Sequence, residues 1–207
     1  MRWQLPMIIL GTFVLSACGG TGQSPSSSTK SLTPSDATSS PGTSTSAAPP
    51  LQGEAASAAT GDIPDNQVFL VFNDAPAGYS MKYPEGWAQR GSGRAVVFRD
   101  KNNIVRVVIG SGAAPTKASV AAELRHLKGA RIAGSPQPIG LPAGRAVKVV
   151  YSTESAPNPV TGKRVILVVD RYYVSKGRRL AVVDLATPQG VDNVDAYRLM
   201  IQSFRWR

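Results

Sequence analysis

Large apolar side chains are almost absent from the 38 residues between Gln23 and Thr60. Ser, Thr, Pro and Ala account for 29 of these residues, and the only large aliphatic side chains are Leu32 and Leu51. Such a stretch cannot bury enough apolar surface to offset the entropy that ordering would cost, so we expect it to be disordered. The core of any folded domain must therefore come from the residues that follow.

The start of the chain has the features of an export signal. Arg2 precedes an apolar run from Leu5 to Leu15, which is shorter than the about 20 residues of a membrane-spanning helix. The run ends in Leu15-Ser16-Ala17-Cys18, which resembles a bacterial lipobox. The resemblance implies that residues 1–17 are a cleaved signal peptide and that the Cys18 thiol carries a diacylglyceryl group. The alternative is an ordinary secretory signal with a cysteine near its cleavage site.

These features divide the chain into three parts. Residues 1–17 form the signal peptide, residues 18–66 a disordered tether that begins at the lipidated cysteine, and residues 67–207 a globular domain. As a flexible chain, the apolar-poor stretch would span roughly 35 Å. It would either lift the domain off the bilayer or serve as a linker whose sequence matters little.

The net positive charge of the chain comes entirely from residues 61–207. The sequence has 23 Lys and Arg against 13 Asp and Glu, and residues 1–60 contribute nothing to the net charge of +10. A basic domain favours acidic partners without naming one. One Cys and one His cannot build a structural zinc finger, an iron–sulfur site or a disulfide framework. We expect no cofactor and no metal ion.

Beyond the tether, β-branched segments separated by turn residues predict a strand-rich domain. The predicted strands are residues 68–73, 78–83, 95–99, 104–109, 143–152, 164–174 and 180–186. The strand at 164–174 has apolar residues on both faces, which is typical of a sheet covered on both sides.

Two helices are predicted from caps and apolar spacing. The first would begin at Thr116 or Ser119 and run to Lys128. The second closes the chain, with Asp192 as its cap. Its expected buried stripe consists of Val194, Tyr197, Ile201 and Phe204.

The segment from Gly78 to Trp87, which ends in Tyr83-Pro84-Glu85-Gly86-Trp87, resembles the opening signature of the PsbP-like fold. The segments Ala95–Asp100, Leu141–Gly144 and Ser203–Arg205 are similar to later parts of that family. The resemblance implies an α+β fold, with an α/β/α sandwich around an antiparallel β-sheet. The family includes a photosystem II subunit, a Ran-binding nuclear import factor and LpqN-type bacterial lipoproteins, which share no enzymatic activity. With its lipobox, this chain is most similar to the bacterial lipoproteins.

The corner of this signature has a clear physical basis. Pro84 fixes its own φ and favours an extended conformation at Tyr83. Gly86 permits a positive φ that turns Trp87 back over the sheet. We expect Trp87 to pack in the core, and the alternative is a tryptophan that stacks on a ligand.

No pattern of catalytic residues emerges from the sequence. His126, the only histidine, is expected on the exposed side of its helix between Arg125 and Lys128. Nothing in the spacing connects it with a Ser–Asp pair, or with carboxylates such as Asp170 and Asp184 as a metal site. We therefore predict no catalytic residue and a protein that is not an enzyme.

The basic side chains are the remaining functional signal. Arg125, Lys128, Arg178 and Arg179 are candidate contacts to anionic lipid headgroups or wall polymers, each worth about 1 kcal/mol near an anionic surface. The alternative is a solvated surface that only keeps the domain soluble. Nucleic acid is not expected as a partner, because no aromatic residue can be assigned to these clusters as a stacking platform and the compartment is extracytoplasmic.

Together these features indicate a membrane-anchored extracytoplasmic lipoprotein. Its domain would be a non-catalytic binding or assembly module for a protein partner or a membrane-associated complex. The alternative is a carrier or sensor of a small molecule or lipid, held in a pocket of the sandwich. A deep apolar cavity would favour the carrier, and an open surface patch would favour the binding module.

Overall fold

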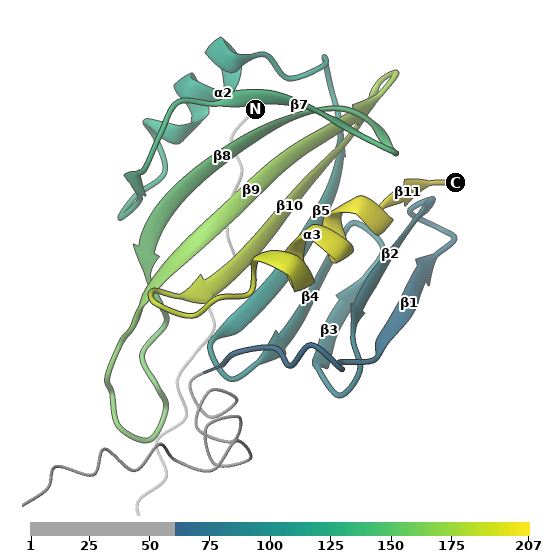
Figure 1. The fold of residues 1–207 in the computed structure, drawn as a ribbon. Helices are drawn as coiled ribbons and strands as arrows, with labels where there is room; N and C mark the ends of the chain where they lie inside the picture. Colours follow the sequence, from purple (N-terminus) through teal and green to yellow (C-terminus); the bar gives the residue numbers. More distant parts are fainter. Residues whose placement is uncertain (1–60) are drawn as a thin grey trace, which may run out of the picture. The chain divides into compact units, whose positions relative to one another are not determined.

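A computed structural model of the chain describes residues 61–207 (Figure 1). The predicted signal peptide at residues 1–17, Cys18 and the tether as far as residue 60 lie outside the described residues. Two residues of the predicted tether, Gly61 and Ile63, are hydrogen-bonded to Asn193 of the domain. Asn193 Oδ1 accepts a hydrogen bond from the Ile63 amide at 2.8 Å, and Asn193 Nδ2 donates to the Gly61 carbonyl at 3.1 Å.

Strands dominate the described residues. They are β1 (Phe69–Asp74), β2 (Tyr79–Pro84), β3 (Ala88–Ser92), β4 (Ala95–Asp100), β5 (Asn103–Ser111), β6 (Arg131–Ile132), β7 (Gln137–Leu141), β8 (Gly144–Glu154), β9 (Ile166–Lys176), β10 (Arg179–Pro188) and β11 (Arg205–Trp206). The helices are α2 (Lys117–Leu124) and α3 (Val194–Ser203).

The strands form two antiparallel sheets. The main sheet has the order β3-β4-β5-β10-β9-β8-β6, with β7 also paired to β8, and the small sheet has the order β1-β2-β11. The central pairing places Val183 of β10 opposite Val107 of β5 and Tyr172 of β9. The expected antiparallel α+β architecture is therefore present, although the small second sheet was not predicted.

One face of the main sheet packs against α3 and the small sheet (Figure 1). The core on this side combines alternate residues of β4, β5 and β10 with the buried side of α3. Phe204, directly after α3, stacks on Tyr79 of the small sheet with ring centroids 5.6 Å apart. Fully buried members of this core include Val96, Phe98, Val105, Val107, Val183, Leu185 and Met200.

The opposite face of the main sheet packs against α2. Val120 and Leu124 of the helix are buried against Val149 and Tyr173 of the sheet. The strand β9 therefore has a hydrophobic neighbour on each side, as its apolar residues predict. In outline the domain is a sheet with one short helix on one face and a helix plus a small sheet on the other.

Both helices differ in detail from the prediction. The first ends at Leu124, not Lys128, and its cap is Thr116, whose Oγ1 accepts a hydrogen bond from the Ser119 amide at 3.1 Å. The N-cap of α3 is Asn193 and not Asp192. Val194 was expected in the buried stripe but is 60% exposed, because it lies at the solvent-facing start of the helix.

The corner after β2 has the conformation that its proline and glycine predict. Gly86 has a φ of 85°, and the Trp87 amide donates to the Pro84 carbonyl at 3.4 Å. Tyr83 stacks on Phe98 with ring centroids 4.3 Å apart. Trp87 is 8% exposed and belongs to the core on the α3 side.

Replacing Trp87 tests how much the corner contributes to stability. Trp87→Ala should lower the free energy of unfolding by about 3–5 kcal/mol, because it leaves a cavity in the core. Trp87→Phe should lose less, since it retains an aromatic ring. Denaturant unfolding measures both variants, and an unchanged midpoint for the alanine variant would contradict the core assignment.

Candidate functional site

Arg179 holds the end of the chain in place. Its guanidinium donates hydrogen bonds to the carbonyls of Arg207 at 2.7 Å, Ala77 at 3.2 Å and Gly78. It also lies 4.3 Å from the centre of the Trp206 ring. The guanidinium of Arg179, a predicted contact to an anionic surface, is thus engaged within the domain, and that contact stays a prediction. Of that group, the exposed side chains are Arg125, Lys128 and Arg178.

A buried ion pair lies under α2, between the two central strands of the main sheet. Arg171 of β9 and Asp184 of β10 are direct cross-strand partners, and they are 6% and 7% exposed. The guanidinium donates two hydrogen bonds to the carboxylate, Nε to Oδ1 at 2.6 Å and Nη2 to Oδ2 at 3.0 Å. Burial alone would lower the pKa of Arg171, but the hydrogen bonds and charge of Asp184 outweigh burial and raise it.

Neighbouring side chains extend this pair into a network that reaches α2. Glu123 of α2 lies 3.5 Å from Arg171 and accepts a hydrogen bond from the Tyr173 hydroxyl at 2.9 Å. Arg106 of β5 lies 3.5 Å from Asp184. Burial raises the pKa of Tyr173 to about 12, so its hydroxyl stays a hydrogen-bond donor at neutral pH. The network anchors α2 on the sheet.

The other face of the sheet carries an open surface beside α3. Strand alternation directs these side chains to this face, with Tyr172 buried at its end: Lys148, Val150 and Ser152 of β8, and Ile166, Val168, Asp170 and Tyr172 of β9. We call these seven residues the α3-side strip. Ile166 is 41% exposed, and Val150 and Val168 are half-buried. In Figure 1, α3 lies in front of the sheet and leaves β8 uncovered on the viewer's side.

A charged pair occupies one end of the α3-side strip. Lys148 Nζ lies 2.6 Å from Asp170 Oδ2, which also accepts a hydrogen bond from the Tyr172 hydroxyl at 3.3 Å. Burial alone would lower the pKa of Lys148. The pKa is nevertheless raised, with the hydrogen bond to Asp170 as the largest of the opposing causes. A hollow of about 250 Å³ here is bounded by α3 residues such as Val194 and Arg198.

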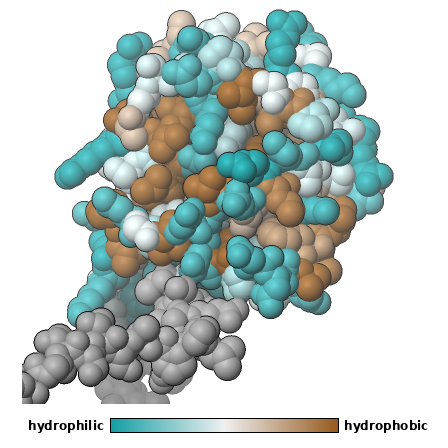
Figure 2. Space-filling model, in the orientation of Figure 1, coloured by the Kyte–Doolittle hydropathy of each residue, from teal (hydrophilic) through white to brown (hydrophobic). Residues whose placement is uncertain are grey.

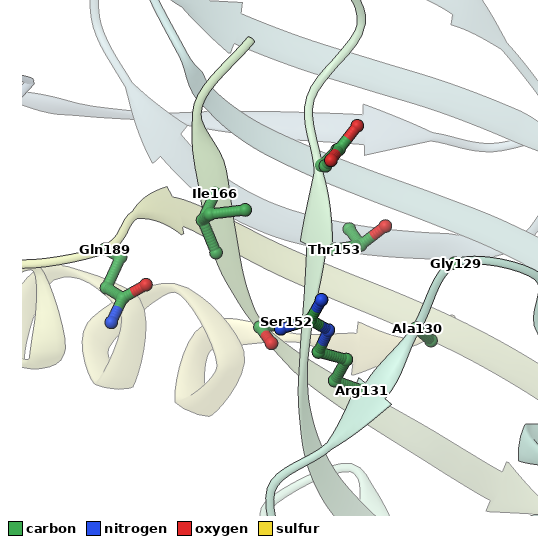
Figure 3. A pocket seen from close by; sticks show the side chains of 8 residues that line it. Gly129, Ala130, Arg131, Ser152, Thr153, Ile166 and Gln189 are labelled. Carbon is green, nitrogen blue, oxygen red and sulfur yellow. The ribbon is translucent and has the colours of Figure 1, made fainter.

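A larger hollow, of about 760 Å³, lies at the other end of the α3-side strip. Figure 3 shows Ile166 and Gln189 on one side of it and Arg131 and Ala130 on the other. Both hollows are open to solvent. Figure 2 shows brown apolar patches on this face among teal polar side chains.

This arrangement suits recognition of a surface more than chemistry. The strip offers apolar contact area, a cation and a carboxylate along two long, rigid strands. Asp170 and Asp184, considered above for a metal site, each form an ion pair. Among residues 61–207, no three His, Cys, Asp or Glu side chains gather as metal ligands. His126 is exposed in the turn after α2.

Sequence reasoning did not find the strip. Its residue types are common in any β-strand. The strip is exposed only because α3 crosses the sheet at another place and leaves these side chains uncovered. The one feature of the sequence that pointed to it was the presence of apolar residues on both faces of β9. Within the described part of the chain, no helix has the length and hydropathy needed to cross a bilayer.

Comparisons with known proteins find similarity at the level of structure only. No family model and no curated protein sequence matches the chain. A cyanobacterial PsbP, CyanoP from Synechocystis, is 16% identical with a TM-score of 0.45, over 71% of this chain and 98% of its own. The Saccharomyces cerevisiae Ran-binding protein Mog1p is 10% identical with a TM-score of 0.45, over 68% and 96%.

A crystal structure from Bacteroides thetaiotaomicron is 17% identical with a TM-score of 0.44. It is matched over 66% of this chain and 48% of its own, so the chain spans about half of its length. The solved neighbours thus include PsbP-like and Mog1p-like folds, among them the family that the corner at Tyr83–Trp87 resembles. At these identities, no partner or activity is transferred from them.

A double-substitution cycle tests the buried pair. Arg171→Met should cost about 3–5 kcal/mol of unfolding free energy, because it leaves the Asp184 carboxylate buried without its main partner. The double variant Arg171→Met/Asp184→Leu should be more stable than the Arg171→Met variant. Urea unfolding measures both, together with the single variant Asp184→Leu that completes the cycle.

The exposed pair Asp195–Arg198 on α3, 2.8 Å apart, is the control. Arg198→Met should cost less than about 1 kcal/mol. If the two single losses at Arg171 and Asp184 simply add in the double variant, the pair does not stabilise the sheet as a unit.

Proposed function

We propose that the chain is a lipid-anchored extracytoplasmic lipoprotein whose PsbP-like domain binds a protein partner through the α3-side strip and catalyses no reaction. The lipobox at Leu15–Cys18 and the apolar-poor tether after it support the anchor. Two acyl chains on one cysteine suffice for stable attachment, where one chain would hold only marginally.

The observation that carries the binding role is the mixed chemistry of the α3-side strip. Ile166, Val150 and Val168 provide apolar contact, and Lys148 and Asp170 provide a charge of each sign. Protein interfaces combine such an apolar centre with polar groups that fix orientation. A carrier of small molecules would need an enclosed cavity, whereas both hollows on this strip open to solvent.

A photo-crosslinking experiment in cells tests the anchor and the strip together. A photoreactive residue replaces Ile166 in the chain with its native Cys18 and in a Cys18→Ser variant. The native chain should fractionate with membranes and crosslink to one discrete protein species. The Cys18→Ser chain should leave the membrane fraction or remain an unprocessed precursor, because the acceptor for the diacylglyceryl group is gone.

The matched control carries the photoreactive residue at Ala95, which is exposed on the opposite face of the main sheet. It should give no crosslink to that protein species. Equal crosslinking from both positions would contradict the strip as the binding surface. A Cys18→Ser chain that is processed and membrane-held as before would contradict the anchor.

A further inference from the structure

The α2 side of the main sheet carries an excess of basic side chains. Strand alternation places many basic side chains on the α2 side: Arg90 of β3, Arg99 of β4, Arg106 of β5 and Arg145 of β8. Arg125 and Lys128 follow α2 itself. The carboxylates that form ion pairs on this side are Asp184 and Glu123, and both contact Arg171. On the α3 side, the carboxylates of Asp170, Glu154 and Asp195 lie beside Lys148, Arg164 and Arg198 respectively.

Three of the arginines surround one apolar side chain. Val97 of β4 lies directly opposite Arg90 on one neighbouring strand and Arg106 on the other. Arg99 follows two residues along β4 and points to the same side. Directly opposed positions in an antiparallel sheet have Cβ atoms about 5 Å apart, so the four side chains form one patch. We call Arg90, Arg99, Arg106 and Val97 the arginine face.

The positive charge of the arginine face is poorly compensated within the domain. Arg106 is 3.5 Å from Asp184, but Arg171 already holds that carboxylate through two shorter hydrogen bonds. Arg90 and Arg99 are exposed, and neither forms an ion pair among the described residues. Arg99 is the diagonal neighbour of both Arg90 and Arg106, so three positive charges lie close together, and a counter-charge from outside would reduce their repulsion.

The surface here is also hollowed. A depression of about 580 Å³ lies over Gly86, Ala88 and Val97, with Arg90, Arg99, Asp100 and Lys101 lining it as well. Small and apolar residues form its floor, and the cationic side chains outnumber the single carboxylate of Asp100. Such a site suits a ligand that combines an anionic group with an apolar part.

We propose that the arginine face docks the domain on the anionic phosphate headgroups of a bilayer. One guanidinium group can donate two parallel hydrogen bonds to two oxygens of a phosphate. The apolar floor of the depression fits the boundary between headgroup and acyl chain. A polymer carrying only charged and hydroxyl groups would leave that floor without a partner. This inference rests on the proposed lipid anchor, which would bring the domain to a bilayer.

Docking in this way would orient the domain. The α3-side strip lies on the opposite face of the same sheet, so it would point away from the bilayer. The anchor, the arginine face and the strip would then have separate tasks: attachment, orientation and partner binding.

Vesicle co-sedimentation of the full chain carrying Cys18→Ser, which lacks the lipid acceptor, tests the proposal. Binding to equimolar phosphatidylglycerol and phosphatidylcholine should exceed binding to phosphatidylcholine alone. It should weaken at high salt, where the Debye length falls to about 3 Å at 1 M. The double variant Arg90→Gln/Arg99→Gln should bind the anionic vesicles about tenfold or more weakly, because each arginine near the surface contributes separately.

The matched control is Lys82→Gln/Arg198→Gln, which removes the same charge from positions off the arginine face. It should retain most of the binding, and melting curves should show that both double variants fold. Equal losses in the two double variants, or no preference for anionic vesicles, would overturn the proposal. Binding of soluble polyphosphate without binding of vesicles would also overturn it, in favour of an anionic polymer. Because the tested chain carries no lipid, these results are independent of whether Cys18 is modified in cells.

Discussion

The buried pair of Arg171 and Asp184 is the constraint on which the central sheet depends. The two side chains can meet only when β9 and β10 pair in the observed register. A slip of β9 by one residue would turn Arg171 toward the opposite core, where Val183 lies, and would leave the Asp184 carboxylate buried without its partner. The pair thus excludes alternative registers more strongly than the apolar residues around it, which would tolerate exchange.

The same pair also determines where α2 packs on the sheet, and so which strands α2 leaves uncovered. Glu123 of α2 reaches Arg171, so the short helix is anchored over β9 and β10. That leaves β3, β4 and part of β5 uncovered on the α2 side, where the arginine face lies. On the other side α3 packs near the small sheet and leaves β8 and β9 open as the α3-side strip. Both candidate surfaces are therefore the parts of one sheet that its two helices do not cover.

Much of the fold follows from the sequence, because long strands and corners have local causes. The strands β8, β9 and β10 are rich in β-branched residues, and the corner at Pro84–Trp87 follows from proline and glycine geometry. The strand β3 was missed because its sequence, Ala-Gln-Arg-Gly-Ser, has no apolar alternation and pairs only as an edge. The end of α2 was placed too late because apolar spacing continues into the turn at Leu127.

The candidate surfaces were harder to predict, because they depend on contacts between distant residues. Asp170 and Arg171 are neighbours in sequence but lie on opposite faces, one in the strip and one in the buried pair. Arg178 and Arg179 are equally basic in sequence, yet only the second is held by three carbonyls of residues that lie elsewhere in the chain. Which arginines remain available is a property of the packed domain, because pairing of β3, β4 and β5 brings Arg90, Arg99 and Arg106 onto one face.

We propose that the two faces of the sheet have different tasks, with the α2 side against the membrane. Arginine-specific dicarbonyl labelling of the lipidated full chain, in anionic membranes and after detergent release, tests it directly. Membranes should protect Arg90 and Arg99 from the reagent while Arg198 on α3 stays as reactive as in detergent. Protection of Arg198 with full reactivity of Arg90 and Arg99, or equal reactivity of all three in both conditions, would contradict the claim.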